Sequence, residues 1–124
     1  MIVRTFKPRF APLVEQGEKN QTVRPKPKRK QDMPRVGQVI SLRTWTGRPY
    51  FSKQRILRES VITEVVPIRI AKNGVSINRK RLTTEQVIEF ARRDGFGDVG
   101  WLNMVEWFSE THGLPFSGIL IRWK

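Results

Sequence analysis

A lysine, a threonine and an arginine stand close together near the start of the chain, at Lys19, Thr22 and Arg24. A threonine hydroxyl is a poor nucleophile unless a neighbouring base takes its proton. A lysine can be that base only if burial or nearby positive charge lowers its pKa well below the usual value of about 10.4. The same three residues are also ordinary phosphate contacts, namely a point charge, a hydroxyl and a bidentate fork. A third interpretation is a plain strand that contains Thr22 and Arg24, with Lys19 in solvent.

The basic residues are concentrated directly after this group. The 124-residue chain has 24 Lys and Arg against 11 Asp and Glu, a formal net charge of +13. Between Arg24 and Arg58 there are 11 basic residues and one acid, a net +10 that leaves +3 for the rest of the chain. Such an excess indicates a polyanionic partner. A basic amphipathic helix would favour binding to a membrane surface, but four prolines exclude a continuous helix in this segment, namely Pro25, Pro27, Pro34 and Pro49. Nucleic acid is therefore favoured as the partner over a membrane surface, and over a charge that serves solubility alone.

Aromatic residues are interleaved with this basic segment. Bases of single-stranded nucleic acid stack on such rings while Lys and Arg contact the phosphates. Trp45 shares its strand face with Ser41 and Arg43, away from Ile40 and Leu42, which favours a cleft wall. The alternative is that Trp45 belongs to the core, as most tryptophans do. The predicted ligand-binding residues are Arg24, Lys26, Lys28, Arg29, Arg43, Trp45, Arg48, Tyr50 and Lys53.

The elements that must position these residues are short. Alternation and turn residues predict strands at 2–6, 39–45, 60–70, 75–78 and 117–123, and a further short strand that ends at Arg24. Helices are expected at 12–16, from a capping box at Thr83 to about Arg93, and from a cap at Asp98 to Gly113. In the last helix the expected apolar stripe is Trp101, Leu102, Val105 and Phe108.

This order of elements predicts an α+β fold. We expect a small, partly closed β-barrel of five to seven strands with two or three short helices on its rim, forming a single domain over residues 1–124. The segment at 25–35 is expected to be a mobile basic loop. The chain has one His and no Cys, which predicts no disulfide and no conventional transition-metal site. No cofactor is expected. It has no apolar leader and no apolar run approaching 18 residues, which predicts a cytoplasmic protein without a membrane span.

Four short motifs together resemble a known family. The pattern G-x-K-x-x-T-x-R at 17–24 resembles the signature of the ASCH family, small RNA-associated domains with a PUA-like barrel. RVGQV at 35–39 resembles the start of the family's next strand, and VITEVV at 61–66 is similar to the strand after it. ARRDGF at 91–96 resembles the family's A-x-x-E-G-F helix end. The matches extend over nearly the whole chain.

The resemblance implies two functions. ASCH domains are regarded as modules that bind or process RNA, so RNA or another single-stranded nucleic acid is the expected partner. Some small members hydrolyse N4-acetylcytidine with a Lys, a Thr and a Glu, which implies catalytic roles for Lys19 and Thr22. Asp94 stands where the family has Glu, and it is one methylene shorter. Any one of four helical carboxylates could take the place of the family's Glu near Lys19, namely Glu85, Glu89, Glu106 or Glu110.

These considerations leave three hypotheses. The first is an RNA-binding domain with a basic cleft. The alternative is an amidohydrolase that acts on a modified pyrimidine nucleoside, or an RNA-processing hydrolase such as a ribonuclease. The third is an interaction module whose basic face meets an acidic protein.

Overall fold

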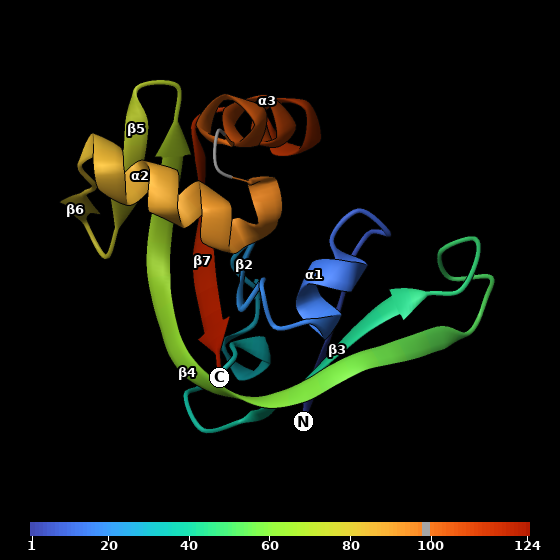
Figure 1. The fold of residues 1–124 in the computed structure, drawn as a ribbon. Helices are drawn as coiled ribbons and strands as arrows, with labels where there is room; N and C mark the ends of the chain where they lie inside the picture. Colours follow the sequence, from blue (N-terminus) through green and yellow to red (C-terminus); the bar gives the residue numbers. More distant parts are fainter. Residues whose placement is uncertain (98–99) are drawn as a thin grey trace.

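The computed structural model describes residues 1–97 and 100–124, which form a mixed α+β fold (Figure 1). The strands are β1 (Ile2–Thr5), β2 (Gln21–Arg24), β3 (Val39–Trp45), β4 (Gln54–Ala71), β5 (Gly74–Ile77), β6 (Lys80–Arg81) and β7 (Phe116–Trp123). The helices are α1 (Ala11–Glu15), α2 (Thr84–Ala91) and α3 (Trp101–His112), with a 3-10 turn η1 (Lys30–Asp32) and a π-helical turn η2 (Arg92–Phe96). The predicted α+β class is therefore confirmed, as is the predicted number of strands and helices.

The long strand β4 organises the sheet, and Figure 1 shows it curving across the molecule. Its first part pairs antiparallel with β3, and its second part pairs with β7 and with β5. β1 is parallel to β3, and β2 pairs with β7 and with no other strand of the described residues. Among the described residues no strand ladder joins β1 to β2, so the sheet is not closed. These two strands are therefore neighbouring free edges.

Two strand predictions differ from the structure. β4 begins at Gln54, six residues before the predicted start. The added residues showed little alternation in the sequence, but they pair with β3 across a register shift between Leu42 and Arg43. β6 was not predicted, since two exposed basic residues have no pattern typical of a strand. The basic segment at 25–35, predicted as an extended loop, contains the turn η1.

The capping box at the start of α2 is confirmed. The Thr83 hydroxyl accepts a hydrogen bond from the Gln86 main-chain N–H, and the Gln86 side chain accepts one from the Thr83 N–H. The helix ends at Ala91, earlier than predicted, and continues as η2, where Gly95 has a left-handed φ of 98°. This turn places Asp94 beyond the regular helix. The predicted cap at Asp98 lies outside the described residues.

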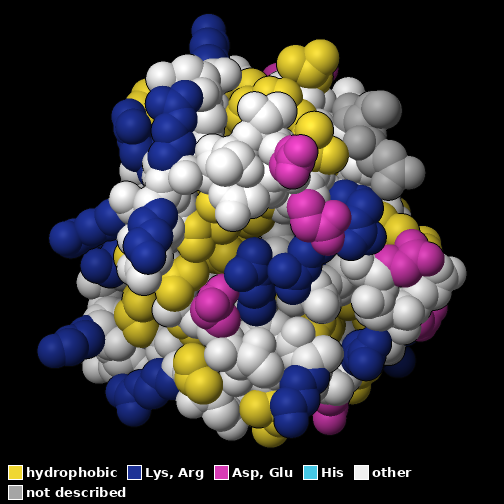
Figure 2. All heavy atoms as spheres, turned by 60° about the vertical axis from the view of Figure 1, so that its left-hand side comes forward, with side chains coloured by type: hydrophobic (Ala, Val, Ile, Leu, Met, Phe, Trp, Pro, Cys, Tyr) yellow, Lys and Arg dark blue, Asp and Glu magenta, His cyan; other side chains and the backbone are white. Residues whose placement is uncertain are grey.

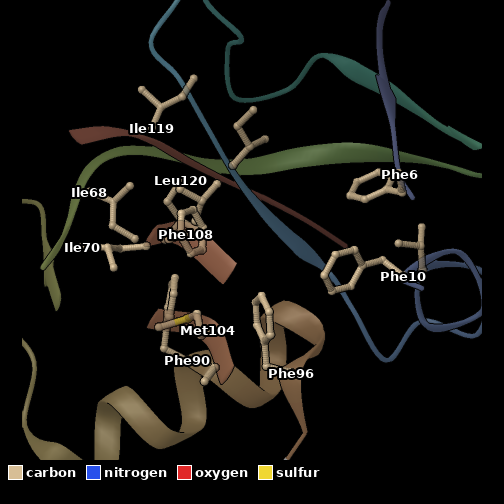
Figure 3. Close-up of a cluster of buried hydrophobic side chains, with 14 of the residues drawn as sticks. Phe6, Phe10, Ile68, Ile70, Phe90, Phe96, Met104, Phe108, Ile119 and Leu120 are labelled. Carbon is tan, nitrogen blue, oxygen red and sulfur yellow. The ribbon is translucent and has the colours of Figure 1, made fainter. Parts of the chain in front are cut away.

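The core lies between the sheet and the helices, and Figure 3 shows part of it. Phe108 and Trp123 are buried, and Trp101 packs against the core, as predicted. The predicted stripe on α3 was wrong at Leu102, which is 75% exposed, whereas Met104 is fully buried. Positions 101, 104 and 108 are spaced as i, i+3 and i+7 and share one helix face, and position 102 lies off that face. No helix within the described residues is long and apolar enough to cross a bilayer.

Candidate functional site

A cavity of about 420 Å³ lies between the end of β1 and β2. Part of its lining forms an aromatic wall, which consists of Phe6, Phe10, Trp45, Tyr50, Phe96, Trp107 and Phe108. Its polar side chains include Lys19, Thr22, Arg24 and Asp94. A cavity of this size with apolar walls and a few convergent polar groups is typical of a small-molecule site.

Three separate parts of the chain supply the aromatic wall. Figure 3 shows Phe10 and Phe96 close together at one end of the core, and their ring centroids are 5.5 Å apart. Trp107 of α3 completes this group, with its ring 6.0 Å from both. On the other side the Trp45 ring lies 5.1 Å from that of Tyr50, in the turn after β3. Trp45 is thus partly buried and lines the cavity, in agreement with the cleft-wall interpretation.

The turn between α1 and β2 delivers Lys19 to the cavity. Gly17, with a φ of 81°, follows the end of α1. The main-chain N–H groups of Glu18 and Lys19 then both donate to the Leu13 carbonyl, at 2.9 and 3.0 Å. These bonds tie the turn to the helix before β2 begins at Gln21. The Lys19 side chain is directed away from solvent as a result, and the residue is 3% exposed.

Lys19 and Asp94 form a buried pair. The Lys19 Nζ donates to the main-chain oxygen of Asp94 at 2.6 Å and lies 3.4 Å from its Oδ1. Asp94 is 4% exposed. Its Oδ1 also accepts a hydrogen bond from the Gln21 Nε2 at 3.2 Å. Gln21 in turn accepts from the Arg122 Nε at 3.1 Å, so the pair is held within a wider polar network.

Burial shifts both members of this pair toward their neutral forms. It lowers the pKa of Lys19 below the usual lysine value, against the opposing attraction of Asp94, and the charge of Arg24 lowers it further. It raises the pKa of Asp94, which the charges of Lys19 and Arg24 oppose. A lysine whose pKa is lowered in this way is closer to the free amine that a general base requires.

Arg24 links the two free strand edges. Its Nε donates to the Thr22 Oγ1 at 3.0 Å, and its Nη2 donates to the Thr5 main-chain oxygen at 2.7 Å. The guanidinium carbon also lies 5.1 Å from the centroid of the Phe6 ring. Burial and the charge of Arg4 lower the pKa of Arg24 to about 10, so it remains a cation at neutral pH. Thr22 is an acceptor in this contact, which leaves its hydroxyl hydrogen available to another group.

The structure brings together six of the predicted site residues and separates the rest. Those that line the cavity are Lys19, Thr22, Arg24, Trp45, Tyr50 and Asp94. The other six predicted residues are not among the described residues that line the cavity; they are Lys26, Lys28, Arg29, Arg43, Arg48 and Lys53. Arg43 instead donates to the Ser41 Oγ and the Gln54 Oε1. The other five lie on the segment after β2 or on the β3–β4 turn.

The helical carboxylates do not reach the site. Each of Glu85, Glu89, Glu106 and Glu110 is exposed. In the described part of the chain, the acid that forms an ion pair with Lys19 is therefore Asp94. The described residues also contain no group of three or more His, Cys, Asp or Glu that could hold a metal ion.

Sequence reasoning missed two kinds of site residue. Gln21 is fully buried and binds Asp94, and its only local signal was a polar residue between Lys19 and Thr22 in the motif. The second kind is the aromatic wall, where Phe6 and Phe10 lie between β1 and α1 but Phe96 lies in η2, and no spacing in the sequence joins these two segments.

Comparison of the chain with family models, with curated proteins and with solved structures found no significant match.

Proposed function

We propose that this chain is an ASCH-like domain that binds RNA, or single-stranded nucleic acid more generally, with one nucleoside held in the cavity. The observation that carries the proposal is the cavity itself, in which aromatic rings surround a polar side that includes Lys19, Thr22 and Arg24. Proteins that read unpaired bases place each base against aromatic side chains and bind its polar edge with a few hydrogen-bonding groups.

The division of the predicted residues supports this arrangement. Lys26, Lys28 and Arg29 lie on the segment that follows β2, and Arg48 is exposed beside the cavity residues Gly47 and Pro49. Cations at such positions would contact phosphates on either side of a base held in the cavity. Phosphate contacts supply affinity and position the strand, and contacts to the base supply recognition.

Positive charge is not restricted to the surroundings of the cavity. Figure 2 shows Lys and Arg side chains scattered over another face of the molecule, with Asp and Glu side chains among them near the centre of the view. A mixed surface of this kind attracts a polyanion only weakly at physiological salt, because opposite charges are interspersed. The base-binding cavity therefore defines the proposed site better than the net charge does.

Arg24 also supports a barrel-like fold within this proposal. The ladders connect β1, β3, β4, β7 and β2 in that order. The Arg24 side chain spans the remaining opening to the carbonyl of Thr5. We propose that these five strands form the partly closed barrel expected of a PUA-like domain, with the nucleoside site at the opening.

Salt dependence of binding tests this function. Fluorescence anisotropy with a labelled uridine octanucleotide should show an affinity that falls with log salt at a slope of roughly −3 to −4, as about four to six phosphate contacts predict. The double variant Lys26→Ala/Lys28→Ala should reduce the magnitude of that slope by about 1.4. The matched control Lys72→Ala/Lys80→Ala removes the same charge from exposed positions that do not line the cavity and should leave it unchanged. Failure of the folded wild type to bind any octanucleotide would reject the proposal.

A second function, hydrolysis of an acylated pyrimidine nucleoside, is favoured by one observation: the buried Lys19–Asp94 pair lies in the same cavity as the Thr22 hydroxyl. With N4-acetylcytidine bound, the Thr22 oxygen would add to the acetyl carbonyl as the Lys19 amine takes its proton. The ammonium would return the proton to the departing cytidine N4, and water would then release acetate from the acyl-threonine. Asp94 would hold Lys19 in place, and Lys19 must come within hydrogen-bond reach of Thr22 when substrate binds.

Release of acetate from N4-acetylcytidine tests this second function. Thr22→Val and Lys19→Ala should abolish turnover. Thr44→Val is the matched control, because Thr44 is also a buried threonine lining the cavity and its hydroxyl donates to the Phe6 carbonyl. It should retain activity if the protein remains folded. Absence of turnover in the wild type would reject the hydrolase for this substrate and leave RNA binding unaffected.

A further inference from the structure

The cavity runs along an unpaired strand edge. β2 pairs with β7 on one side, and the described residues form no ladder on its other side. Three consecutive residues of β2 line the cavity, namely Thr22, Val23 and Arg24. Successive side chains of a strand point to opposite faces, so no single face could supply all three. The cavity therefore meets β2 along its free edge.

The main chain of Val23 points toward this edge. The Trp123 N–H donates to the Asn20 carbonyl at 3.1 Å, which makes these two residues a hydrogen-bonded pair of the antiparallel ladder. Hydrogen-bonded pairs alternate with non-hydrogen-bonded pairs, so Val23 and its partner Leu120 form a non-hydrogen-bonded pair. Both the N–H and the C=O of Val23 then point away from β7. Within the described part of the chain, neither group has a protein hydrogen-bond partner.

The edge of β1 across the opening is occupied by side chains instead. The Thr5 carbonyl accepts from the Arg24 Nη2 at 2.7 Å, and the Val3 carbonyl accepts from the Arg4 Nη1 at 2.9 Å. Such contacts protect an edge strand against pairing with another chain. Val23 therefore differs from Val3 and Thr5 in presenting its main-chain groups unbound at the cavity.

We propose that the N–H and C=O of Val23 read the Watson–Crick edge of the base that occupies the cavity, an inference that rests on the proposed RNA-binding function. In an extended residue the N–H and C=O lie side by side and point in the same direction. Every nucleobase has a donor next to an acceptor on its Watson–Crick edge, so two parallel hydrogen bonds can form. The ligand is then an unpaired base whose Watson–Crick nitrogen is unmodified, and a base in a duplex is excluded because its edge is already paired.

Burial of the Val23 side chain agrees with a main-chain role. Val23 is 5% exposed and belongs to the hydrophobic core, so its side chain anchors the strand while the backbone is presented to the cavity. Reading by the backbone accepts any base with a free edge, since the same N–H and C=O pair complements all four. The aromatic wall would supply the stacking energy, which also tolerates any base.

A methylated oligonucleotide tests the inference directly. A uridine octanucleotide and its uniformly N3-methylated counterpart carry the same phosphates and the same ring faces. The wild type should bind the methylated strand roughly tenfold or more weakly, because the donor is lost and the Val23 C=O remains unpaired in the complex. Equal affinity for the two strands would overturn the inference while leaving RNA binding intact.

Two variants assign the effect to Val23. Val23→Pro removes the N–H at an edge position that faces away from the ladder, where proline is tolerated. It should bind the uridine strand more weakly and discriminate less against methylation. Val3→Pro is the matched control: it makes the same change at the edge of β1, at a residue that is not among the described lining residues, and it should discriminate as the wild type does. Full discrimination by a folded Val23→Pro variant would overturn the inference.

An NMR measurement gives the same answer without a variant. In 15N-valine-labelled wild type, the Val23 amide proton should move downfield when the uridine octanucleotide binds, as a new hydrogen bond requires. If the strand binds and the Val23 signal does not change, the inference about Val23 is overturned while the proposed RNA binding stands. Failure of the folded wild type to bind any octanucleotide would overturn the proposed function and this inference together.

Discussion

Lys19 and Asp94 are 75 positions apart in the chain, yet the Lys19 Nζ lies 2.6 Å from the main-chain oxygen of Asp94 and 3.4 Å from its Oδ1. The contact connects the turn before β2 to the turn after α2, and both residues are almost fully buried. A buried ion pair adds little net stability compared with apolar residues, but removal of one partner leaves an uncompensated charge. The pair therefore fixes the geometry of the cavity more than it stabilises the fold.

Lys19→Met should make stability depend strongly on pH. Without Lys19, the already raised pKa of Asp94 rises further, because burial remains and the nearest cation is gone. Above the unfolded value of 3.8 and below this raised value, the folded state holds a proton that the unfolded state has lost. The free energy of unfolding should therefore fall as the pH rises through this window, with a loss of about 3–5 kcal/mol relative to wild type at pH 7. Urea unfolding between pH 4 and 7.5 measures it.

The double variant Lys19→Met/Asp94→Asn is the control for this pH dependence. It has no carboxyl group at position 94, so its stability should not decline over the same pH window. A decline that persists in the double variant would show that another group is responsible.

Arg24→Lys should destabilise the protein although the charge is retained. Arg24 uses two different nitrogens to bind the Thr22 hydroxyl and the Thr5 carbonyl, and a lysine ammonium lacks this planar fork. Loss of one hydrogen bond to a charged donor costs about 1.5–3 kcal/mol, reduced here because the residue is partly exposed. Urea unfolding should show this loss, and native-state hydrogen exchange should show faster opening at β1. Wild-type stability in Arg24→Lys would contradict the bridging role.

Gly95→Ala should disturb the site through packing. An added Cβ at Gly95 would lie 2.9 Å from the Phe10 Cδ1 and 3.3 Å from the Lys19 Cδ, at a φ of 98°. Gly37→Ala is the matched control, because Gly37 has a φ of 93° and a Cβ there would meet no atom of the described residues within 4 Å. Both variants carry the backbone strain of about 1–2 kcal/mol, and only Gly95→Ala adds the clash. Equal unfolding free energies for the two would contradict the close packing at Gly95.

Tyr50→Ala should weaken nucleic-acid binding without altering the fold. Tyr50 is 85% exposed, lines the cavity and lies 5.1 Å from Trp45. Loss of one stacking ring reduces affinity by roughly tenfold. Phe51→Ala is the matched control, since Phe51 is 76% exposed but is not among the described lining residues. Anisotropy titrations of both variants should separate them, and equal affinities would argue against a stacking role for Tyr50.

Features that depend on neighbouring residues could be predicted from the sequence. The capping box at Thr83 and the strand at 39–45 follow from local hydrogen bonding and alternation, which act over a few positions. The same is true of the turn that contains Lys19 and of the short strand after it, which contains Thr22 and Arg24, because Gly17 marks the end of the preceding helix locally.

Lys19, Thr22 and Asp94 could be named as candidates from the sequence alone. Gln21 and the phenylalanines of the cavity could not, because the packing of distant segments determines which residues meet. Whether Asp94 reaches Lys19 depends on how η2 packs against the turn before β2, and no local pattern encodes that distance. The free edge at Val23 likewise exists because, within residues 1–97 and 100–124, β2 pairs with β7 alone, at the far end of the chain. Long-range pairing of this kind depends on the burial of the whole core, which residue spacing cannot specify.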